Sequence, residues 1–92
     1  MTAQIRQHVY YRGRVQGVGF RYTAVRCAEA YDVTGFVRNL DDGRVELVVE
    51  GAKADVQNLL DDIRTSMSGN IRQETSDTSD PTGEFRDFAV RY

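Results

Sequence analysis

Several residue types that mark well-known protein classes are scarce in this chain of 92 residues. Its single cysteine, Cys27, excludes an internal disulfide and a multi-cysteine zinc site, and this usage fits a reducing compartment. No apolar run approaches the roughly 18 to 20 consecutive residues that a membrane span requires, and the N-terminus lacks the apolar centre of a signal peptide. We therefore expect one domain over residues 1–92, located in the cytoplasm and without a membrane partner.

The chain also lacks a net positive charge. The formal net charge is -2 and the isoelectric point is near 5.3, which argues against a nucleic-acid partner or an anionic membrane. Every basic residue except Lys53 is an arginine, whose planar fork suits phosphate or carboxylate, although the same bias can be genomic. The cations gather in the first half of an otherwise acidic chain, which predicts a local anion site; they are Arg6, Arg12, Arg14, Arg21, Arg26, Arg38 and Arg44.

What the sequence does contain is two kinds of periodicity. Apolar residues alternate in runs typical of half-buried strands, and they recur at steps of three and four in two segments typical of helices. We expect strands at residues 8–15, 33–40, 44–50, 71–76 and 85–92, and helices at residues 21–31 and 52–67. Phe85 is out of phase with the last strand, so we expect a bulge or a late strand start near Arg86.

The order of these elements predicts an α+β fold. Two helices on one face of a mostly antiparallel sheet would bury both apolar helix stripes. This arrangement is the ferredoxin-like α/β sandwich, βαββαβ, with a short extra strand.

The first candidate for chemistry is Arg21 together with the loop before it. A cation in the first turn of a helix faces the positive end of the helix dipole, at a cost of about 0.3 to 1 kcal/mol when exposed, and a bound anion would relieve this conflict. The loop can aim backbone N–H groups at that anion; it comprises Gln16, Gly17, Val18, Gly19 and Phe20. The plainer interpretation is a tight turn followed by a solvated arginine, and the loop alone does not decide between the two.

The second candidate is Asn39, which stands just before the turn Asp41-Asp42-Gly43 and could simply initiate that turn. When a helix connects two strands of one sheet by a crossover, the two strands run parallel. The loop after the first strand and Asn39 at the end of the second therefore fall at the same edge of the sheet. With the hairpin strand between them, they would lie roughly 10 Å apart, which an arginine side chain, a phosphate and a water can fill.

Other candidates have plainer interpretations. Cys27 lies on the apolar helix stripe with no histidine placed to activate it, so we expect a packed thiol. His8 heads the outward face of the first strand, where we expect a surface residue. For Asp41-Asp42 we expect a turn, and for Asp61-Asp62 a solvated helix face. Both interpretations are preferred to acid/base pairs or magnesium ligands.

Two segments, residues 13–21 (GRVQGVGFR) and residues 35–46 (GFVRNLDDGRVE), closely resemble the two signature segments of the acylphosphatase family, in order and at the expected spacing. The ending, residues 88–92 (FAVRY), resembles the last strand of that family, so the resemblance spans essentially the whole chain. Phe36 stands where a tryptophan is common. Residues 66–70 replace the usual Gly-Pro-containing link after the second helix, which leaves the path of the next strand open.

This resemblance implies a hydrolase that cleaves the carboxyl–phosphate bond of small acyl phosphates to carboxylate and inorganic phosphate. Arg21 is implied as the phosphate-binding residue and Asn39 as the residue that orients the attacking water, with residues 16–20 as the phosphate cradle. No metal or cofactor is implied, and we expect a monomer.

Two alternatives remain open at this point. Ferredoxin-like sheets also carry non-catalytic modules that bind RNA or protein, but residues 44–50 offer no aromatic stacking platform and include two glutamates. Similar domains also serve carbamoyl-transferring maturation enzymes, which are far longer chains.

Overall fold

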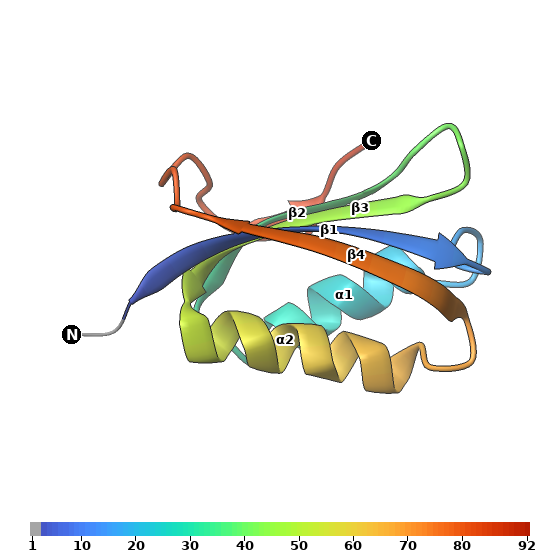
Figure 1. The fold of residues 1–92 in the computed structure, drawn as a ribbon, viewed down its shortest axis with the longest axis horizontal. Coiled ribbons are helices and arrows are strands. Elements are labelled where there is room, and N and C mark those ends of the chain that lie inside the picture. Colours follow the sequence, from blue (N-terminus) through green and yellow to red (C-terminus); the bar gives the residue numbers. More distant parts are fainter. Residues whose placement is uncertain (1–2) are drawn as a thin grey trace.

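The computed structural model describes residues 3–92, which form two helices and a five-stranded sheet. The elements follow one another as β1 Gln4–Gly13, α1 Phe20–Ala28, β2 Val33–Asn39, β3 Val45–Ala52, α2 Lys53–Ser66, β4 Ile71–Ser79 and β5 Phe88–Val90. Both helices lie against the same face of the sheet (Figure 1). The predicted α/β sandwich with a short extra strand is therefore confirmed. Within residues 3–92, no helix is long and apolar enough to cross a membrane.

The order of the strands across the sheet is β4-β1-β3-β2-β5. The central strand β3 pairs antiparallel with both β1 and β2, so β1 and β2 run parallel to each other on either side of it. Only the short β5 makes a parallel pair, with β2. As the crossover argument predicts, the loop after β1 and the end of β2 therefore lie at one edge of the sheet, separated by β3.

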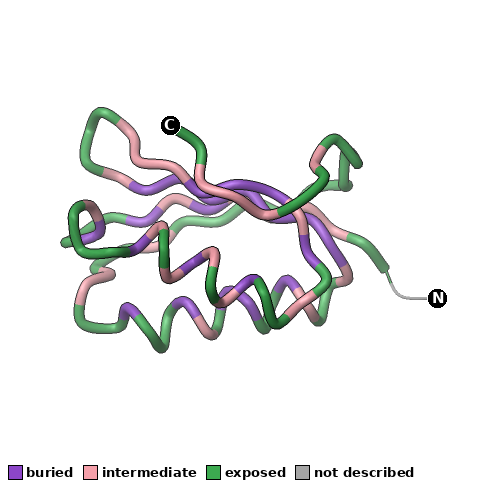
Figure 2. Tube along the Cα trace, turned by 180° about the vertical axis from the view of Figure 1, so that it is seen from behind, coloured by how far each residue is buried: buried purple, intermediate pink, exposed green. Residues whose placement is uncertain are grey.

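The core lies between the sheet and the helices. Alternate residues of β3 point toward the helices, which is why Val45, Leu47 and Val49 are fully buried. The apolar faces of the two helices pack against these residues. They contribute Phe20 and Ala24 from α1, and Val56, Leu59, Leu60 and Ile63 from α2. Figure 2 shows the buried stretches on the helices turned toward the buried strands in the middle of the sheet.

The element boundaries differ from the sequence-based prediction where pairing rather than periodicity sets them. Strand β1 begins at Gln4 instead of residue 8, because its polar start pairs with the end of β3. Strand β4 continues to Ser79, because its polar residues pair with β1 along one edge, while its other edge has no neighbouring strand within residues 3–92. Helix α1 ends at Ala28, three residues early.

The last strand starts late, at Phe88, which explains why Phe85 is out of phase. Phe85 lies outside the strand and packs on the sheet face opposite the helices, where its ring centroid is 5.8 Å from that of Phe36. The Arg6 guanidinium lies 5.5 Å from the Phe85 ring on the same face. Phe85 thus covers the outer face and takes no part in the alternation of β5.

The link between α2 and β4 follows a short turn whose path the sequence left open. The Asn70 N–H donates to the Met67 carbonyl at 2.9 Å and ends the helical region. Asn70 then holds the loop after β1, because its carbonyl accepts from the Arg14 N–H at 2.9 Å and its side-chain amide donates to the Arg14 carbonyl at 3.0 Å. This link fixes the start of the loop that precedes Arg21.

Candidate functional site

The loop between β1 and α1 has a backbone that requires glycine at two positions. Gly17 has φ of 73° and Gly19 has φ of 82°, both in the left-handed region that other residues enter at a cost. Helix α1 begins directly afterwards, and the Thr23 N–H donates to the Gly19 carbonyl at 2.9 Å. The glycines therefore bend the chain so that it enters the helix immediately after the loop.

The backbone N–H groups of this loop are free of acceptors in the part of the chain that the structure describes. Within residues 3–92, none of the backbone N–H groups of residues 16–22 donates to a backbone or side-chain oxygen. Residues 20–22 also form the first turn of α1, where such groups carry the positive end of the helix dipole. A cluster of free donors at a helix start is suited to bind an anion.

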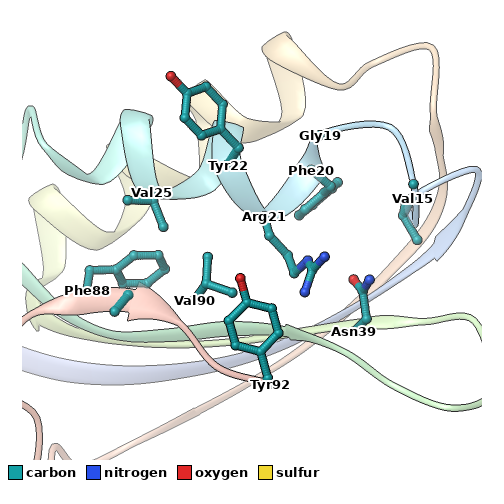
Figure 3. A pocket seen from close by; sticks show the side chains of 12 residues that line it. Val15, Gly19, Phe20, Arg21, Tyr22, Val25, Asn39, Phe88, Val90 and Tyr92 are labelled. Carbon is teal, nitrogen blue, oxygen red and sulfur yellow. The ribbon is translucent and has the colours of Figure 1, made fainter.

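Arg21 lies in this first turn and points from the helix toward the sheet (Figure 3). Its side chain is half-buried, yet it pairs with no carboxylate among residues 3–92. The other half-buried arginines all do: Arg6 with Glu50 and Glu84, Arg38 with Glu46, and Arg44 with Asp42. The Arg21 guanidinium lies 5.3 Å from the centroid of the Tyr92 ring. Arg21 is thus a positive charge held in place without a carboxylate partner from the described part of the chain.

Asn39 is the last residue of β2 and lies opposite Val45 of β3. Its side chain points toward Arg21 (Figure 3), and its Oδ1 atom is buried without a hydrogen-bond partner within residues 3–92. Leaving such an acceptor unsatisfied costs about 1 to 3 kcal/mol. A buried and unpartnered amide at the end of a strand is therefore a group that a bound molecule would satisfy.

The two candidate residues line one cavity of about 400 Å³ between α1 and the end of the sheet. Gly17, Gly19 and Phe20 of the predicted cradle line it as well. The structure thus brings Arg21, Asn39 and part of the loop together, as the topology predicts. A cavity of this size lies within the range of about 300 to 1,000 Å³ that is typical of small-molecule sites.

Two residues of the predicted cradle do not contribute side chains to this cavity. The Gln16 amide instead donates to the Leu40 carbonyl at 2.7 Å and to the Arg44 carbonyl at 2.9 Å, which ties the loop to the turn after β2. Val18 is exposed and is not among the lining residues. For both residues, only the backbone remains available for an anion.

Sequence reasoning missed most of the apolar wall of the cavity. Tyr22 and Val25 of α1, Phe88, Ala89 and Val90 of β5, and Tyr92 all line it. The sequence gives one indication of this wall: Val25 is an apolar residue beside the main apolar stripe of its helix. The rest depends on β5 lying next to β2, which pattern analysis does not reveal.

The charged groups on the opposite face of the sheet form a separate network. Glu46 is buried there and accepts from Arg38 Nε at 2.5 Å, and its other oxygen lies 2.7 Å from His8 Nε2. Burial would raise the pKa of Glu46, but the hydrogen bonds from His8 and Arg38 outweigh it and lower that pKa. His8 therefore lies on the outward face, as predicted, but it is half-buried against a carboxylate.

The comparison with known proteins agrees with this geometry. Residues 7–90 match the family model described as acylphosphatase. A curated protein of Roseiflexus sp. (strain RS-1) named acylphosphatase is 44% identical, and the alignment covers 98% of each chain. The crystal structure of acylphosphatase from Bacillus subtilis superposes with a TM-score of 0.85 at 28% identity, covering 96% of this chain and 99% of that one. The HypF structure from T. kodakarensis, at 31% identity and a TM-score of 0.79, matches the whole chain but only 12% of its own length.

Proposed function

This chain belongs to the acylphosphatase family and is a hydrolase of acyl phosphates, and from that premise we propose that Arg21 binds the phosphoryl group while Asn39 holds the attacking water. The backbone N–H groups of residues 16–20 form the phosphate cradle in this proposal, with no metal and no cofactor.

The observation that carries the proposal is the pairing of two unsatisfied groups in one cavity. Arg21 is the only half-buried arginine of residues 3–92 that lacks a carboxylate partner, and Asn39 Oδ1 is a buried acceptor without a donor. A phosphoryl dianion supplies the missing negative charge, and a water supplies the missing donor. Both deficits are therefore satisfied by the reactants of acyl phosphate hydrolysis.

The proposed chemistry places charge stabilisation and positioning on separate residues. Arg21 and the loop N–H groups bind the equatorial oxygens of the phosphoryl group and stabilise the charge that develops there. Asn39 Oδ1 accepts a hydrogen bond from the water and holds it in line with the scissile bond. The water oxygen forms the new bond to phosphorus, and the carboxylate leaves with the electron pair of the broken P–O bond.

The proton of the attacking water needs an acceptor, and the cavity wall suggests which one. No carboxylate or imidazole lines the cavity within the described residues, and an asparagine amide is not a base at neutral pH. In the proposal, a phosphoryl oxygen therefore takes the proton, and the carboxylate leaves without an acid. A plot of kcat/KM against pH that demands a protein base near neutrality would contradict this step.

We extend the proposal to a monomer in the cytoplasm that acts on a small molecule without a nucleic-acid partner. The outer face of the central strand β3 supports the last point, because it carries the buried Glu46 and Glu50 in place of exposed stacking aromatics. Gel filtration tests whether the protein is a monomer, and a titration with single-stranded RNA tests whether it binds nucleic acid.

The test of the site is hydrolysis of acetyl phosphate in excess chelator. We expect Arg21→Ala to lower kcat/KM on the order of 100-fold or more and to weaken inhibition by inorganic phosphate, since it removes a preorganised cation. Asn39→Ala should lower kcat to a similar extent while phosphate inhibition stays within about twofold of wild type.

Two matched controls lie outside the cavity. Arg14→Ala removes an exposed arginine from the same loop, and Asn58→Ala removes an exposed asparagine from α2. Both should keep wild-type kinetics. Wild-type activity in either Arg21→Ala or Asn39→Ala would refute the assignment of these two residues.

A further inference from the structure

The side chain of Gln16 connects the loop after β1 to the hairpin end that carries Asn39. Its amide nitrogen donates to the Leu40 carbonyl at 2.7 Å and to the Arg44 carbonyl at 2.9 Å. Leu40 directly follows Asn39, and Arg44 directly precedes Val45, the residue that pairs with Asn39 across the hairpin. Both hydrogen bonds therefore end one residue away from the last residue pair of β2 and β3, to which Asn39 belongs.

Strand β3 separates the two parts of the site that Gln16 connects. The loop of residues 16–20 follows β1, Asn39 ends β2, and β3 lies between these two strands. Ladder hydrogen bonds join neighbouring strands only, so the ladder itself does not tie the loop to the end of β2. The Gln16 amide reaches across this separation, because its acceptors lie on both sides of the hairpin end, Leu40 after β2 and Arg44 before β3.

Asn39 depends on its backbone for the position of its side-chain oxygen. The Oδ1 atom is buried and has no hydrogen-bond partner within residues 3–92, so no donor from this part of the chain fixes the direction in which it points. Asn39 is also the last residue of β2, and the ends of such elements open more readily than their middles. A contact that holds the hairpin end therefore determines how precisely Asn39 can hold a water.

We propose that Gln16 is a positioning residue that sets the distance and direction between the phosphate cradle and the water on Asn39. Within residues 3–92, its side chain is not among those that line the cavity, so it acts through Asn39 and not on the reactants. This inference rests on the proposed function of Arg21 and Asn39. In-line attack requires close approach and alignment, and a misplacement of about 1 Å can cost on the order of 100-fold in rate.

The experiment measures hydrolysis of acetyl phosphate by the full chain in excess chelator. Gln16→Met approximately keeps the length of the side chain and removes both hydrogen bonds. Its kcat should fall on the order of tenfold, while inhibition by inorganic phosphate stays within about threefold of wild type. Gln16→Asn is one methylene shorter and cannot reach both carbonyls, so it should show the same separation between kcat and phosphate inhibition.

A double-mutant cycle shows whether Gln16 acts through Asn39. Residues that act as a unit have non-additive effects, because the second substitution has little left to disturb once the first has removed the shared function. In the Asn39→Ala background, Gln16→Met should therefore change the residual kcat by less than about twofold, against about tenfold in the wild-type background.

Tyr31→Phe controls for a loss of activity that comes only from lower stability. The Tyr31 hydroxyl donates to Asp62 Oδ2 at 2.5 Å, beyond the C-terminal end of α1 and away from the cavity-lining residues. This variant should lower the urea midpoint of unfolding to an extent comparable with Gln16→Met, since it also loses hydrogen bonding. Its kcat should stay within about twofold of wild type.

The outcomes separate this inference from the function on which it rests. Wild-type kcat in both Gln16 variants overturns the positioning role, and so does an equal loss of kcat in Tyr31→Phe. Phosphate inhibition weakened about tenfold in Gln16→Met, or an effect of about tenfold on kcat that persists in the Asn39→Ala background, overturns it as well. In each of these cases, hydrolysis that still depends on Arg21 and Asn39 leaves the proposed function standing. Wild-type activity in Asn39→Ala overturns both.

Discussion

The carboxylate of Glu50 is expected to make a large and pH-dependent contribution to stability. It lies on the sheet face opposite the helices with only 4% of its side chain exposed, and it accepts from Arg6 Nη1 at 2.7 Å. The N–H groups of Thr82 and Gly83 also donate to it, at 3.0 and 2.9 Å. Burial would raise the pKa of Glu50, but these hydrogen bonds outweigh burial and lower that pKa to about 2.

The sign of the effect follows from the lowered pKa. Because the folded state holds the carboxylate more readily than the unfolded state, the stabilisation is present above the ordinary pKa of 4.5 and is lost as the pH falls toward about 2. A difference between 4.5 and about 2 corresponds to up to about 3 kcal/mol at neutral pH.

The assay is urea unfolding of wild type and Glu50→Gln at intervals between pH 7 and pH 2. The variant should be about 2 to 3 kcal/mol less stable at pH 7, and the difference should shrink to less than about 1 kcal/mol near pH 2, where about half of the wild-type carboxyl groups are protonated. Glu84→Gln is the control, because Glu84 contacts the same Arg6 with 55% of its side chain exposed, and it should change stability by less than about 1 kcal/mol. A constant difference between wild type and Glu50→Gln across this pH range would refute the reasoning.

Three further substitutions probe single features of the fold by the same unfolding measurement. Tyr11→Phe should raise the free energy of unfolding by about 1 kcal/mol, because the Tyr11 hydroxyl is buried without a hydrogen-bond partner among residues 3–92; a loss of stability would show that the hydroxyl is satisfied. Gln16→Met should cost about 1 to 2 kcal/mol, because it removes two hydrogen bonds from the Gln16 amide to the Leu40 and Arg44 carbonyls, which keep their backbone donors. Inorganic phosphate should still bind, and tenfold weaker phosphate inhibition would contradict that separation. Gly35→Ala should cost more than about 3 kcal/mol or prevent folding, because its φ is 144° and the new Cβ would lie 1.9 Å from a carbonyl oxygen of β3; Gly69→Ala, which meets nothing within 4 Å, is the control and should be neutral.

Much of the fold was predictable because its core elements carry strong apolar periodicity. Helix α2 runs within one residue of the predicted bounds, since Val56, Leu59 and Ile63 fix its buried face. The polar strand β4 was predicted three residues too short, because its last residues are held by pairing with β1 and not by an apolar pattern. Periodicity predicts an element that buries one face, whereas an exposed edge strand is specified mainly by its neighbour.

The site was predictable only in part, for a related reason. The crossover connection and the hairpin order place Arg21 and Asn39 at the same sheet edge, and that reasoning needs no side-chain detail. The apolar wall combines Val25 with Phe88 and Val90, which are far apart in the sequence and meet because β5 pairs with β2. The sequence also cannot show that Gln16 uses its amide on the turn after β2, since local pattern does not determine hydrogen-bond partners.

The register of the central strand explains why Arg21 pairs with none of the many carboxylates of residues 3–92. Successive residues of β3 point to opposite faces, so Glu46 and Glu50 face away from the helices and pair there with Arg38 and Arg6. A shift of one residue in this pairing would turn the glutamates toward the helix face, with Glu46 opposite Asn39 in place of Val45. A carboxylate at that position would attract Arg21 and repel a phosphate. The alternation of β3 therefore stabilises the sheet through ion pairs on one face and keeps the anion site free of competing charge on the other.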